Sequence, residues 1–473
     1  MNWDEYAEWA ARIGAWGADY HKGLRDRPVR AQTKPGEIAA QLAESPPEQP
    51  EDMAEIFGDI DKIVMPGMTH WQHPRFFAYF NSNAAPPSML ADQVASVLAA
   101  QCMLWQTSPA ATEVETRVLD WLRQGLGLPE GFAGVIQDSA SSATLAAVLT
   151  MRERALKFTG NQTGLSGAPR LRIYCSAEVH SSIDKAIWIA GIGQDNLVKI
   201  PITAGDPRRG IDASALRTAI EADVAQGFTP AGIIPCIGGT GTGAADDLNA
   251  VMDVAEAFEL YTHVDAAWAG SAMLCPEFRT LWAGVERAHS VVMNPHKWLG
   301  TNFDLCAHFV RTPEDLVRTL AIQPEYLKTH GADGIINYSE WSIPLGRRFR
   351  ALKLWFLIRA YGLEGLRTRL RNHVDWVQGL CERLRALDGV EIVTEPVLAL
   401  FTFRYVDADP DGFNLALVNA INDDGRIYLT QTKVDGALAI RFTGCQFDAT
   451  HADVDMAFDV ITEIAARLKG EPT

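Results

Sequence analysis

The sequence predicts an α/β fold: a mostly parallel sheet flanked by helices, preceded by a helical segment and followed by a smaller α/β portion. From residue 134 onward, short apolar runs typical of buried strands alternate with longer helical stretches, which is the pattern of successive βαβ units. The length of 473 residues, with 47% hydrophobic and 21% charged residues, is ordinary for a globular protein of roughly two to four domains.

The N-terminal segment is predicted to be helical. Aromatic and aliphatic residues recur at three- and four-residue steps from Trp3 to Tyr20, which predicts a helix with one aromatic stripe. Two partners for this stripe are open: the rest of its own domain, or a second subunit. A proline-rich joint follows at 45–52, and Asp52 or a neighbour is expected to begin a helix over 53–64.

The middle and C-terminal parts contain the predicted strands. Residues 86–130 are expected to be mostly helical, with the SPAATEVE segment at 108–115 capping a helix. The predicted strands are 133–137, 172–176, 231–237, 261–267 and 289–294, then, after a long helix that begins past Arg350, 391–395, 398–406 and 438–444. We therefore expect a helical segment over 1–80, a large α/β domain over 81–350 and a small C-terminal α/β domain over 351–473.

The composition narrows the classes of partner. A net charge of −17 repels phosphate backbones and anionic lipid, so neither nucleic acid nor a membrane surface is an expected partner. No apolar run reaches the roughly 18–20 residues that a bilayer span needs. The acidic first residues do not resemble a signal peptide, and seven cysteines without CxxC pairs argue against a disulfide framework. We expect a cytoplasmic protein without a metal site.

Polar residues follow several predicted strands, where parallel sheets bind their ligands. Asp138–Ser142 forms a small polar turn that opens a helix, and it suits either a phosphate or an ordinary serine N-cap. The glycine-rich segment 238–244 matches a loose dinucleotide-binding pattern. We reject that interpretation because the segment lies deep in the chain and because Asp246 and Asp247 would crowd a pyrophosphate. A close approach to a flat ligand fits this segment better.

Three further side chains predict one cofactor. Asp265 ends a strand in apolar company, where a carboxylate needs a cationic partner unless it caps the next segment. Lys297 follows a buried strand between His296 and Trp298, where burial would leave its amine nucleophilic; alone, it would more simply be solvated. His180 follows another strand and suits ring stacking, helix capping or a core position. Together they favour pyridoxal 5′-phosphate, whose aldehyde, ring nitrogen and phosphate suit the lysine, the carboxylate and the helix N-terminus.

Longer motifs support the same cofactor. They are NPHKW at 294–298, HVDAAWAG at 263–270, IPLGRRFRALKLWF at 343–356, THWQHPRFFAYF at 69–80 and CPEFR at 275–279. This set resembles the group II pyridoxal-phosphate decarboxylases, and within them the aromatic-L-amino-acid decarboxylases. The resemblance implies fold type I of the pyridoxal-phosphate enzymes and an obligate homodimer in which the N-terminal segment packs over the partner subunit.

The resemblance also implies roles for individual residues. Lys297 would bind the cofactor covalently, Asp265 would pair with the ring nitrogen, His180 would stack on the ring and His296 would flank the lysine. Tyr326, in a predicted mobile loop, would donate a proton to Cα, which favours an amine over an aldehyde as product. The other implied contacts are Ala140, Ser141 and Asn294 at the phosphate, Thr240 and Ala267 near the ring, and Trp71, Tyr79, Phe80, Ser82, Gln101, Met103, His180 and Gly346 around the substrate.

The substrate expected from the resemblance is an aromatic L-amino acid, and which ring is preferred is left open. A decarboxylase of glutamate or diaminobutyrate is an alternative, although no extra arginine appears in the FAYFNSNAAPPS segment at 77–88. An oxygen-using aldehyde synthase is disfavoured by Tyr326. An aminotransferase would share the cofactor and the fold, but it would protonate C4′ of the cofactor and bind a second carboxylate with a dedicated arginine. A binding protein without activity is disfavoured because Lys297, Asp265 and His180 are all present.

Overall fold

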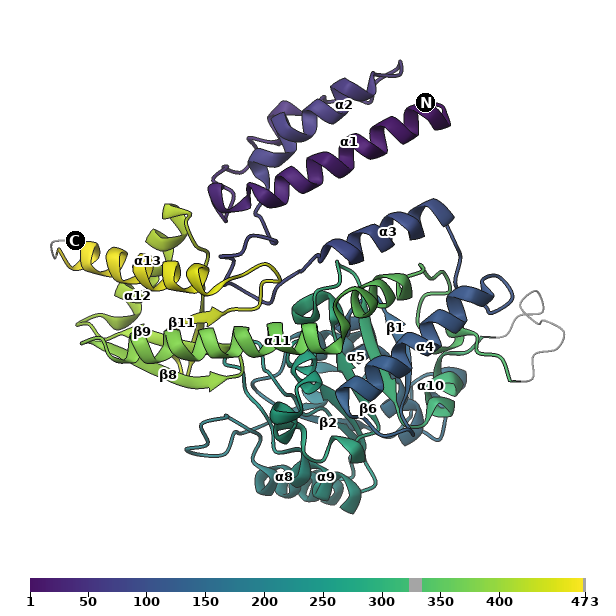
Figure 1. The fold of residues 1–473 in the computed structure, drawn as a ribbon. Helices are drawn as coiled ribbons and strands as arrows, with labels where there is room; N and C mark the ends of the chain where they lie inside the picture. Colours follow the sequence, from purple (N-terminus) through teal and green to yellow (C-terminus); the bar gives the residue numbers. More distant parts are fainter. Residues whose placement is uncertain (323–333, 471–473) are drawn as a thin grey trace. The chain divides into compact units, whose positions relative to one another are not determined.

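The computed structural model describes residues 1–322 and 334–470, which form two compact units. Figure 1 shows the chain coloured along the sequence. The finer division into three segments stays a prediction. The large unit comprises residues 82–378 and 393–402, and the small unit comprises residues 1–81, 379–392 and 403–473.

A seven-stranded sheet forms the centre of the large unit, with the strand order β1-β7-β6-β5-β4-β2-β3. β7 is antiparallel to both of its neighbours, and the other neighbouring strands are parallel. The predicted α/β fold with a mostly parallel sheet is therefore confirmed. The strands are β1 (Ala133–Gln137), β2 (Leu171–Ser176), β3 (Leu197–Ile200), β4 (Thr229–Ile233), β5 (Tyr261–Asp265), β6 (Ser290–Met293) and β7 (Cys306–Val310).

Helices cover both faces of this sheet. Most of them lie between consecutive strands, as expected for βαβ units. The helices of the large unit are α3 (Pro86–Leu98), α4 (Pro109–Leu126), α5 (Ala140–Ala155), α6 (Gly160–Thr163), α7 (Ser182–Ile189), α8 (Ala213–Ala225), α9 (Leu248–Ala257) and α10 (Pro313–Leu320), and α11 (Ala351–Arg385) continues into the small unit.

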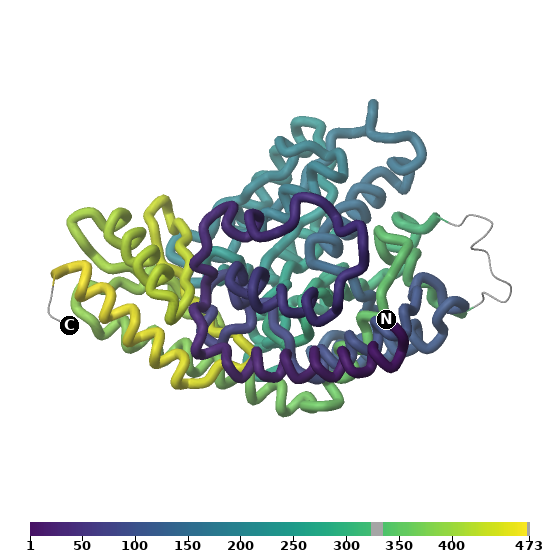
Figure 2. Tube along the Cα trace, turned by 90° about the horizontal axis from the view of Figure 1, so that it is seen from above, coloured from purple at the N-terminus to yellow at the C-terminus, as the bar shows by residue number. Residues whose placement is uncertain are grey.

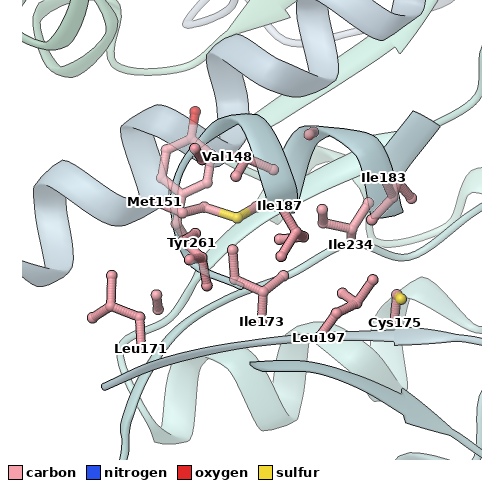
Figure 3. Packing of buried hydrophobic residues seen from close by; sticks show 14 of the residues in the cluster. Val148, Met151, Leu171, Ile173, Cys175, Ile183, Ile187, Leu197, Ile234 and Tyr261 are labelled. Atoms are coloured by element: carbon pink, nitrogen blue, oxygen red, sulfur yellow. The ribbon is translucent and has the colours of Figure 1, made fainter. Parts of the chain in front are cut away.

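The alternation of side chains along β2 shows how the two faces are filled. Ile173 and Cys175 pack with residues of α5 and α7 on one face (Figure 3). Tyr174, between them, packs with residues of α8 and α9 on the other face. Successive strand residues point to opposite faces, so a strand that is covered on both sides is apolar at nearly every position.

Short polar side chains begin the helices that follow the strands. Ser139 caps α5, Asp212 caps α8 and Asp247 caps α9, each accepting a hydrogen bond from a backbone N–H of the first turn. The segment at 108–115 begins α4 as expected, with Ser108 at the N-cap position, but the Ser108 side chain does not accept a hydrogen bond from the first turn. The Ser108 hydroxyl instead donates to the carbonyl of Gln101 at 3.1 Å.

The small unit contains a four-stranded sheet with the order β10-β11-β9-β8. Two of these strands, β8 and β9, continue at one end into residues of the large unit. The elements are α1 (Trp3–Lys22), α2 (Met53–Asp59), β8 (Val390–Val397), β9 (Leu400–Tyr405), α12 (Pro410–Asp424), β10 (Thr430–Val434), β11 (Ala437–Thr443) and α13 (His451–Lys469).

The N-terminal helix α1 lies beside α2, and Figure 2 shows the two running next to each other. Trp9 and Trp16 of α1 meet Phe57 of α2 edge to face, with ring centroids 5.6 and 6.1 Å apart. Trp3 and Ile13 remain 84% and 44% exposed. Residues of α2 therefore cover part of the predicted aromatic stripe, and the rest of the stripe is exposed on this chain.

Two whole-chain features follow from the described residues. None of the helices they form has both the length and the apolar character needed to cross a bilayer. The seven cysteines are all buried free thiols.

Candidate functional site

Lys297 lies in an irregular turn directly after β6. The turn spans Pro295–Leu299, and the φ and ψ of Lys297, −93° and −110°, are not helical. Its N–H donates to the carbonyl of Asn294 at 2.9 Å, and its own carbonyl accepts from Nδ2 of Asn83 at 2.7 Å. The backbone that carries the half-buried lysine is therefore fixed on both sides.

Asp265 ends β5, the strand next to β6, and is 8% exposed. Its backbone pairs with the segment after β4: its N–H donates to the carbonyl of Pro235, and its carbonyl accepts from Ile237, both at 2.9 Å. Its Oδ1 accepts the N–H of Ala267 at 3.1 Å. A carboxylate is thus presented at the carboxyl end of the sheet, in apolar surroundings where a cation would stabilise it.

The turns that carry Asp265 and Lys297 are joined directly. The N–H of Asn294 donates to the carbonyl of Ala267 at 2.8 Å. The buried rings of Trp268 and Trp298 stack with centroids 5.0 Å apart and planes 12° apart. These contacts hold the carboxylate turn and the lysine turn as one rigid element.

His180 completes the group. Its pKa is lowered because part of the ring is buried and because the nearby Lys297 is positively charged, while Asp265 acts in the opposite direction. Its Nδ1 accepts the N–H of Ser182 at 3.1 Å, which puts the proton of the neutral ring on Nε2. The bond from the Ser182 N–H is the helix-capping contact considered from the sequence, and stacking on a ring stays a prediction.

His296 lies behind the lysine turn and is 4% exposed. Burial, followed by the charge of Lys297, lowers its pKa to about 3, so the ring is neutral. Its Nδ1 accepts the N–H of Leu305 at 2.9 Å. The ring therefore holds the lysine turn against the segment that leads into β7.

The start of α5 lies close to the end of β6. Ala140 packs against the buried cluster of Ala143, Val292 and Cys306. Ser139 is the serine N-cap considered from the sequence, whereas Ala140 and Ser141 occupy the first helical positions, whose N–H groups have no partner within a helix. Such N–H groups and the helix dipole favour an anion.

Asn294 adds an unsatisfied polar group to this edge of the sheet. It is 3% exposed, and its Oδ1 is buried without a hydrogen-bond partner in the described part of the chain. A buried polar atom without a partner in the protein is a sign of a missing ligand.

The glycine-rich segment forms a tight turn after β4. The N–H groups of Gly238 and Gly239 both donate to the carbonyl of Ala244, at 2.8 and 2.9 Å. Asp246 is buried and accepts from the N–H of Cys236 at 2.7 Å, and burial raises its pKa to about 6. This arrangement, in which Asp247 caps the next helix, agrees with the rejection of a dinucleotide loop.

The IPLGRRFR motif is held by a buried ion pair that sequence reasoning missed. Arg347 and Glu115, 232 positions apart, bind through two hydrogen bonds of 2.6 and 3.1 Å, with both side chains at most 4% exposed. Arg347 also donates to the carbonyls of Ile136 at 2.8 Å and Cys102 at 3.3 Å. The pair therefore connects the motif at 343–356 to the SPAATEVE segment and to β1.

Further along the same motif, two cations hold the loop that follows the lysine turn. Arg350 binds the carboxylate of Asp304 at 2.9 and 3.1 Å. Lys353 donates to the carbonyls of Asn302 at 3.2 Å and Asp304 at 2.7 Å, and burial lowers its pKa to about 8. This loop includes the backbone next to Leu305, which fixes His296.

The predicted substrate contacts are divided between the two units. In the large unit, Gln101 accepts the N–H of Arg347 at 2.7 Å, and its Nε2 would stand 3.2 Å from a Cβ at Gly346. Gly346 thus leaves room that the glutamine side chain partly fills. Ser82 and Met103 also belong to this unit and are partly buried.

In the small unit, the rings of Trp71 and Tyr79 stack with centroids 5.8 Å apart. Arg441 lies 4.7 Å from the ring centroid of Phe80 and donates to the carbonyl of Tyr79 at 2.6 Å. The segment at 77–88 contains no arginine, and sequence reasoning missed Arg441 because it comes from a distant strand. The meeting of these residues with those of the large unit stays a prediction.

Two other predicted site residues are Thr240 and Tyr326. Thr240 lies in the glycine-rich turn after β4 and is partly buried. Tyr326 and the loop around it lie outside the described residues, so the predicted proton donor stays a prediction.

The family follows from comparison with known proteins. Residues 35–406 match the pyridoxal-dependent decarboxylase conserved domain. The chain belongs to the pyridoxal-dependent decarboxylase family. Its cofactor is pyridoxal 5′-phosphate, and the resemblance inferred from the motifs is confirmed.

Several matching relatives are named as decarboxylases of aromatic amino acids. The chain is 35% identical to tryptophan decarboxylase 2 of Oryza sativa subsp. japonica, covering 100% of this chain and 96% of the relative. It is 38% identical to aromatic-L-amino-acid decarboxylase of Mus musculus, covering 95% of each chain. The crystal structure of Oryza sativa TDC with PLP and tryptamine superposes with a TM-score of 0.95 at 34% identity, covering 99% of each chain.

Aldehyde synthases match the chain as well. Phenylacetaldehyde synthase of Arabidopsis thaliana is 35% identical, covering 99% of this chain and 97% of that protein. Membership of the family therefore shows a pyridoxal-phosphate-dependent carboxy-lyase. Whether the product is an amine or an aldehyde is a question for experiment.

The residues at this edge of the sheet fit the cofactor. Lys297 supplies an amine, Asp265 a buried carboxylate, His180 a neutral ring, and the start of α5 with Asn294 supplies polar groups for a phosphate. These are the groups that an aldehyde, a pyridine nitrogen, a flat ring and a phosphate require.

Proposed function

We propose that this protein removes CO₂ from an aromatic L-amino acid and releases the corresponding amine, with Lys297 as the residue that holds the cofactor. The observation that carries the proposal is the convergence of Lys297, Asp265 and His180 at the carboxyl edge of the sheet. The names of the matching relatives support an aromatic substrate.

The cofactor supplies the electron-withdrawing chemistry. When bound, pyridoxal 5′-phosphate offers an aldehyde to an amine and a protonated ring that takes up the electrons left by the departing carboxylate. Asp265 would keep the proton on the ring nitrogen, because a buried carboxylate stabilises a neighbouring positive charge. His180, neutral near pH 7, would cover the ring face without adding charge repulsion.

Lys297 is the better anchor of two candidate lysines. Lys353 is the other candidate, because burial lowers the pKa of its amine to about 8. However, Lys353 is 1% exposed, and its Nζ donates to two carbonyls of the loop at 302–304. Lys297 is half-buried, on a turn between the carboxylate and the helix N-terminus, and so remains accessible to a ligand.

The amine is proposed as product because the residue at position 326 is a tyrosine. Its hydroxyl would carry the proton that Cα needs after CO₂ leaves. A change of this residue to one without an acidic proton would leave Cα open to oxygen, which is the aldehyde-forming outcome.

A homodimer is proposed as the working form. Trp3, Tyr6 and Ile13 of α1 are 84%, 42% and 44% exposed, and apolar side chains gathered on one helix are typical of a contact with another chain. A dimer is measured by light scattering after size exclusion, and a mass near the 51.8 kDa of one chain would contradict it. The cytoplasmic location stays a prediction from the sequence.

The function is tested with a panel of amino acids. Purified protein with pyridoxal 5′-phosphate is incubated with tyrosine, dopa, phenylalanine or tryptophan, and with glutamate and diaminobutyrate as non-aromatic contrasts. CO₂, amine, aldehyde and keto acid are quantified. We expect CO₂ and amine in equal amounts from an aromatic substrate, none from Lys297→Ala, and normal turnover from the exposed control Lys433→Ala. Keto acid as main product, or turnover of glutamate alone, would contradict the proposal.

A further inference from the structure

One carboxylate joins the turn that carries His180 to the glycine-rich turn. Glu178 lies two residues before His180 and accepts from Nε and Nη2 of Arg209 at 3.1 and 2.8 Å. Its other oxygen accepts the hydroxyl of Thr242 at 2.8 Å. Thr242 is buried and belongs to the turn that carries Thr240.

The backbones of the His180 turn and the glycine-rich turn are also in direct contact. A Cβ on Gly239 would stand 2.8 Å from the carbonyl oxygen of Glu178, so the two turns touch where only glycine fits. The loop that supplies Arg209 is also fixed, because the carbonyl of Arg208 accepts the N–H of Ala245 at 2.9 Å. Three segments far apart in the sequence therefore meet at Glu178.

The ion pair between Glu178 and Arg209 is suited to hold the two turns in a fixed arrangement. Glu178 and Arg209 are each 14% exposed, so water screens their interaction little. An arginine that binds one carboxylate through two nitrogens fixes orientation as well as distance. Neither residue was among the candidates from the sequence, because nothing local marks a glutamate in a turn as the partner of an arginine 31 positions away.

We propose that Glu178, held by Arg209, is a positioning residue that keeps His180 and the Thr240 turn at the distance from each other that a flat cofactor ring needs. This inference rests on the proposed function, since it assigns His180 to the ring face. Glu178 itself touches neither ring nor substrate; it acts through the two turns. Residues of this kind tune binding and catalysis by holding contacting side chains in place.

The test uses Glu178→Gln and Arg209→Lys in the full chain. Glu178→Gln removes the charge and keeps the size, and Arg209→Lys keeps the charge and removes the two-nitrogen geometry. Glu256→Gln is the matched control, since Glu256 also binds one arginine, Arg287, through two hydrogen bonds of 2.9 and 2.7 Å, at the opposite end of the strands.

The first readout is the dissociation constant for pyridoxal 5′-phosphate, titrated into the apoprotein and followed by absorbance. We expect about tenfold weaker binding for Glu178→Gln, a smaller loss for Arg209→Lys, and a change of less than about twofold for Glu256→Gln. The double variant should bind no more weakly than the worse single variant if the two residues act as a pair.

The second readout is the pKa of His180, measured by NMR of the apoprotein, and it separates positioning from simple charge loss. Release of the ring from Lys297 and from its partly buried place raises this pKa toward the ordinary value near 6.5. Loss of a nearby negative charge alone would lower it. We therefore expect a rise in Glu178→Gln and no change in Glu256→Gln.

The outcomes distinguish this inference from the proposed function. If the unsubstituted protein binds no pyridoxal 5′-phosphate, the proposed function fails and this inference with it. If the unsubstituted protein binds and turns over substrate, but Glu178→Gln binds equally well with an unchanged or lowered His180 pKa, only the positioning role is overturned. A rise in His180 pKa together with weaker cofactor binding supports it.

Discussion

Replacing Arg347 by methionine would remove one side of the buried ion pair and leave Glu115 charged in the core. Arg347 and Glu115 are 4% and 3% exposed, and Arg347 binds both carboxylate oxygens and two backbone carbonyls. Breaking a buried pair by removing one partner costs about 3–5 kcal/mol, mostly because the remaining charge is uncompensated. We expect a loss of that size in the free energy of unfolding of the large unit.

The assay is urea unfolding followed by tryptophan fluorescence. The double variant Arg347→Met with Glu115→Leu should recover much of the loss, because no buried charge is then left without a partner. Arg371→Met is the control: its partners Glu277 and Glu364 are 45% and 68% exposed, and its unfolding midpoint should stay unchanged.

A loss below about 1 kcal/mol in Arg347→Met would refute this reasoning, since that is the value of an exposed ion pair. A double variant less stable than Arg347→Met would also refute it, because the cost would then come from packing. Either result would mean that the motif at 343–356 is not held by its charge pair.

Three more predictions concern the site and its pH dependence. Asp265→Ala should weaken cofactor binding by about 1.5–3 kcal/mol in an absorbance titration and slow CO₂ release further, and near-native values would show that another acid serves the ring. Tyr326→Phe should shift the product from amine toward aldehyde, ammonia and peroxide; unchanged amine with no aldehyde would exclude the tyrosine as donor. Burial lowers the pKa of three histidines, His289, His296 and His308, to about 4, 3 and 4. Their pKa in the unfolded chain is near 6.5, so between about pH 6.5 and pH 4 these histidines gain protons mainly in the unfolded chain. The free energy of unfolding should therefore be highest above pH 6.5 and fall by about 2 kcal/mol per histidine by pH 5. In His296→Gln, the urea midpoint should fall less between pH 6.5 and pH 5 than in the unsubstituted protein.

Five of the seven strands of the large sheet, β1, β2, β4, β5 and β6, could be predicted because helices cover both faces of the sheet, whereas β3 and β7 were not among the predicted strands. β5 is the clearest case, since all five residues of Tyr261–Asp265 are buried and the apolar run ends in a carboxylate. The strand β7 was not predicted, and its direction could not be, because a short apolar run carries no information on whether it pairs parallel or antiparallel. The loop between β6 and β7 is held by Arg350 and Lys353, which lie at the start of the motif's helix, far from that loop in the sequence.

The candidate reacting groups were predicted from the sequence, whereas the residues that support them were not. Asp265 ends a strand, His180 and Lys297 lie in the turns that follow two other strands, and the combination of the three residue types favours one cofactor. The ion pairs that hold the surrounding segments join residues far apart in the sequence: Glu115 is 232 positions from Arg347, and Arg209 reaches Glu178 from another loop. Such pairs depend on how the segments pack, which local pattern does not record.

The central claim is that Lys297 holds the cofactor, and one mapping experiment tests it most directly. Borohydride reduction of the loaded protein fixes the cofactor to the amine that carries it, and mass spectrometry of the digested protein locates that amine. We predict a single modified peptide containing Lys297, which disappears in Lys297→Ala. Modification of Lys353, whose pKa is also lowered to about 8, or of neither lysine, would contradict the account.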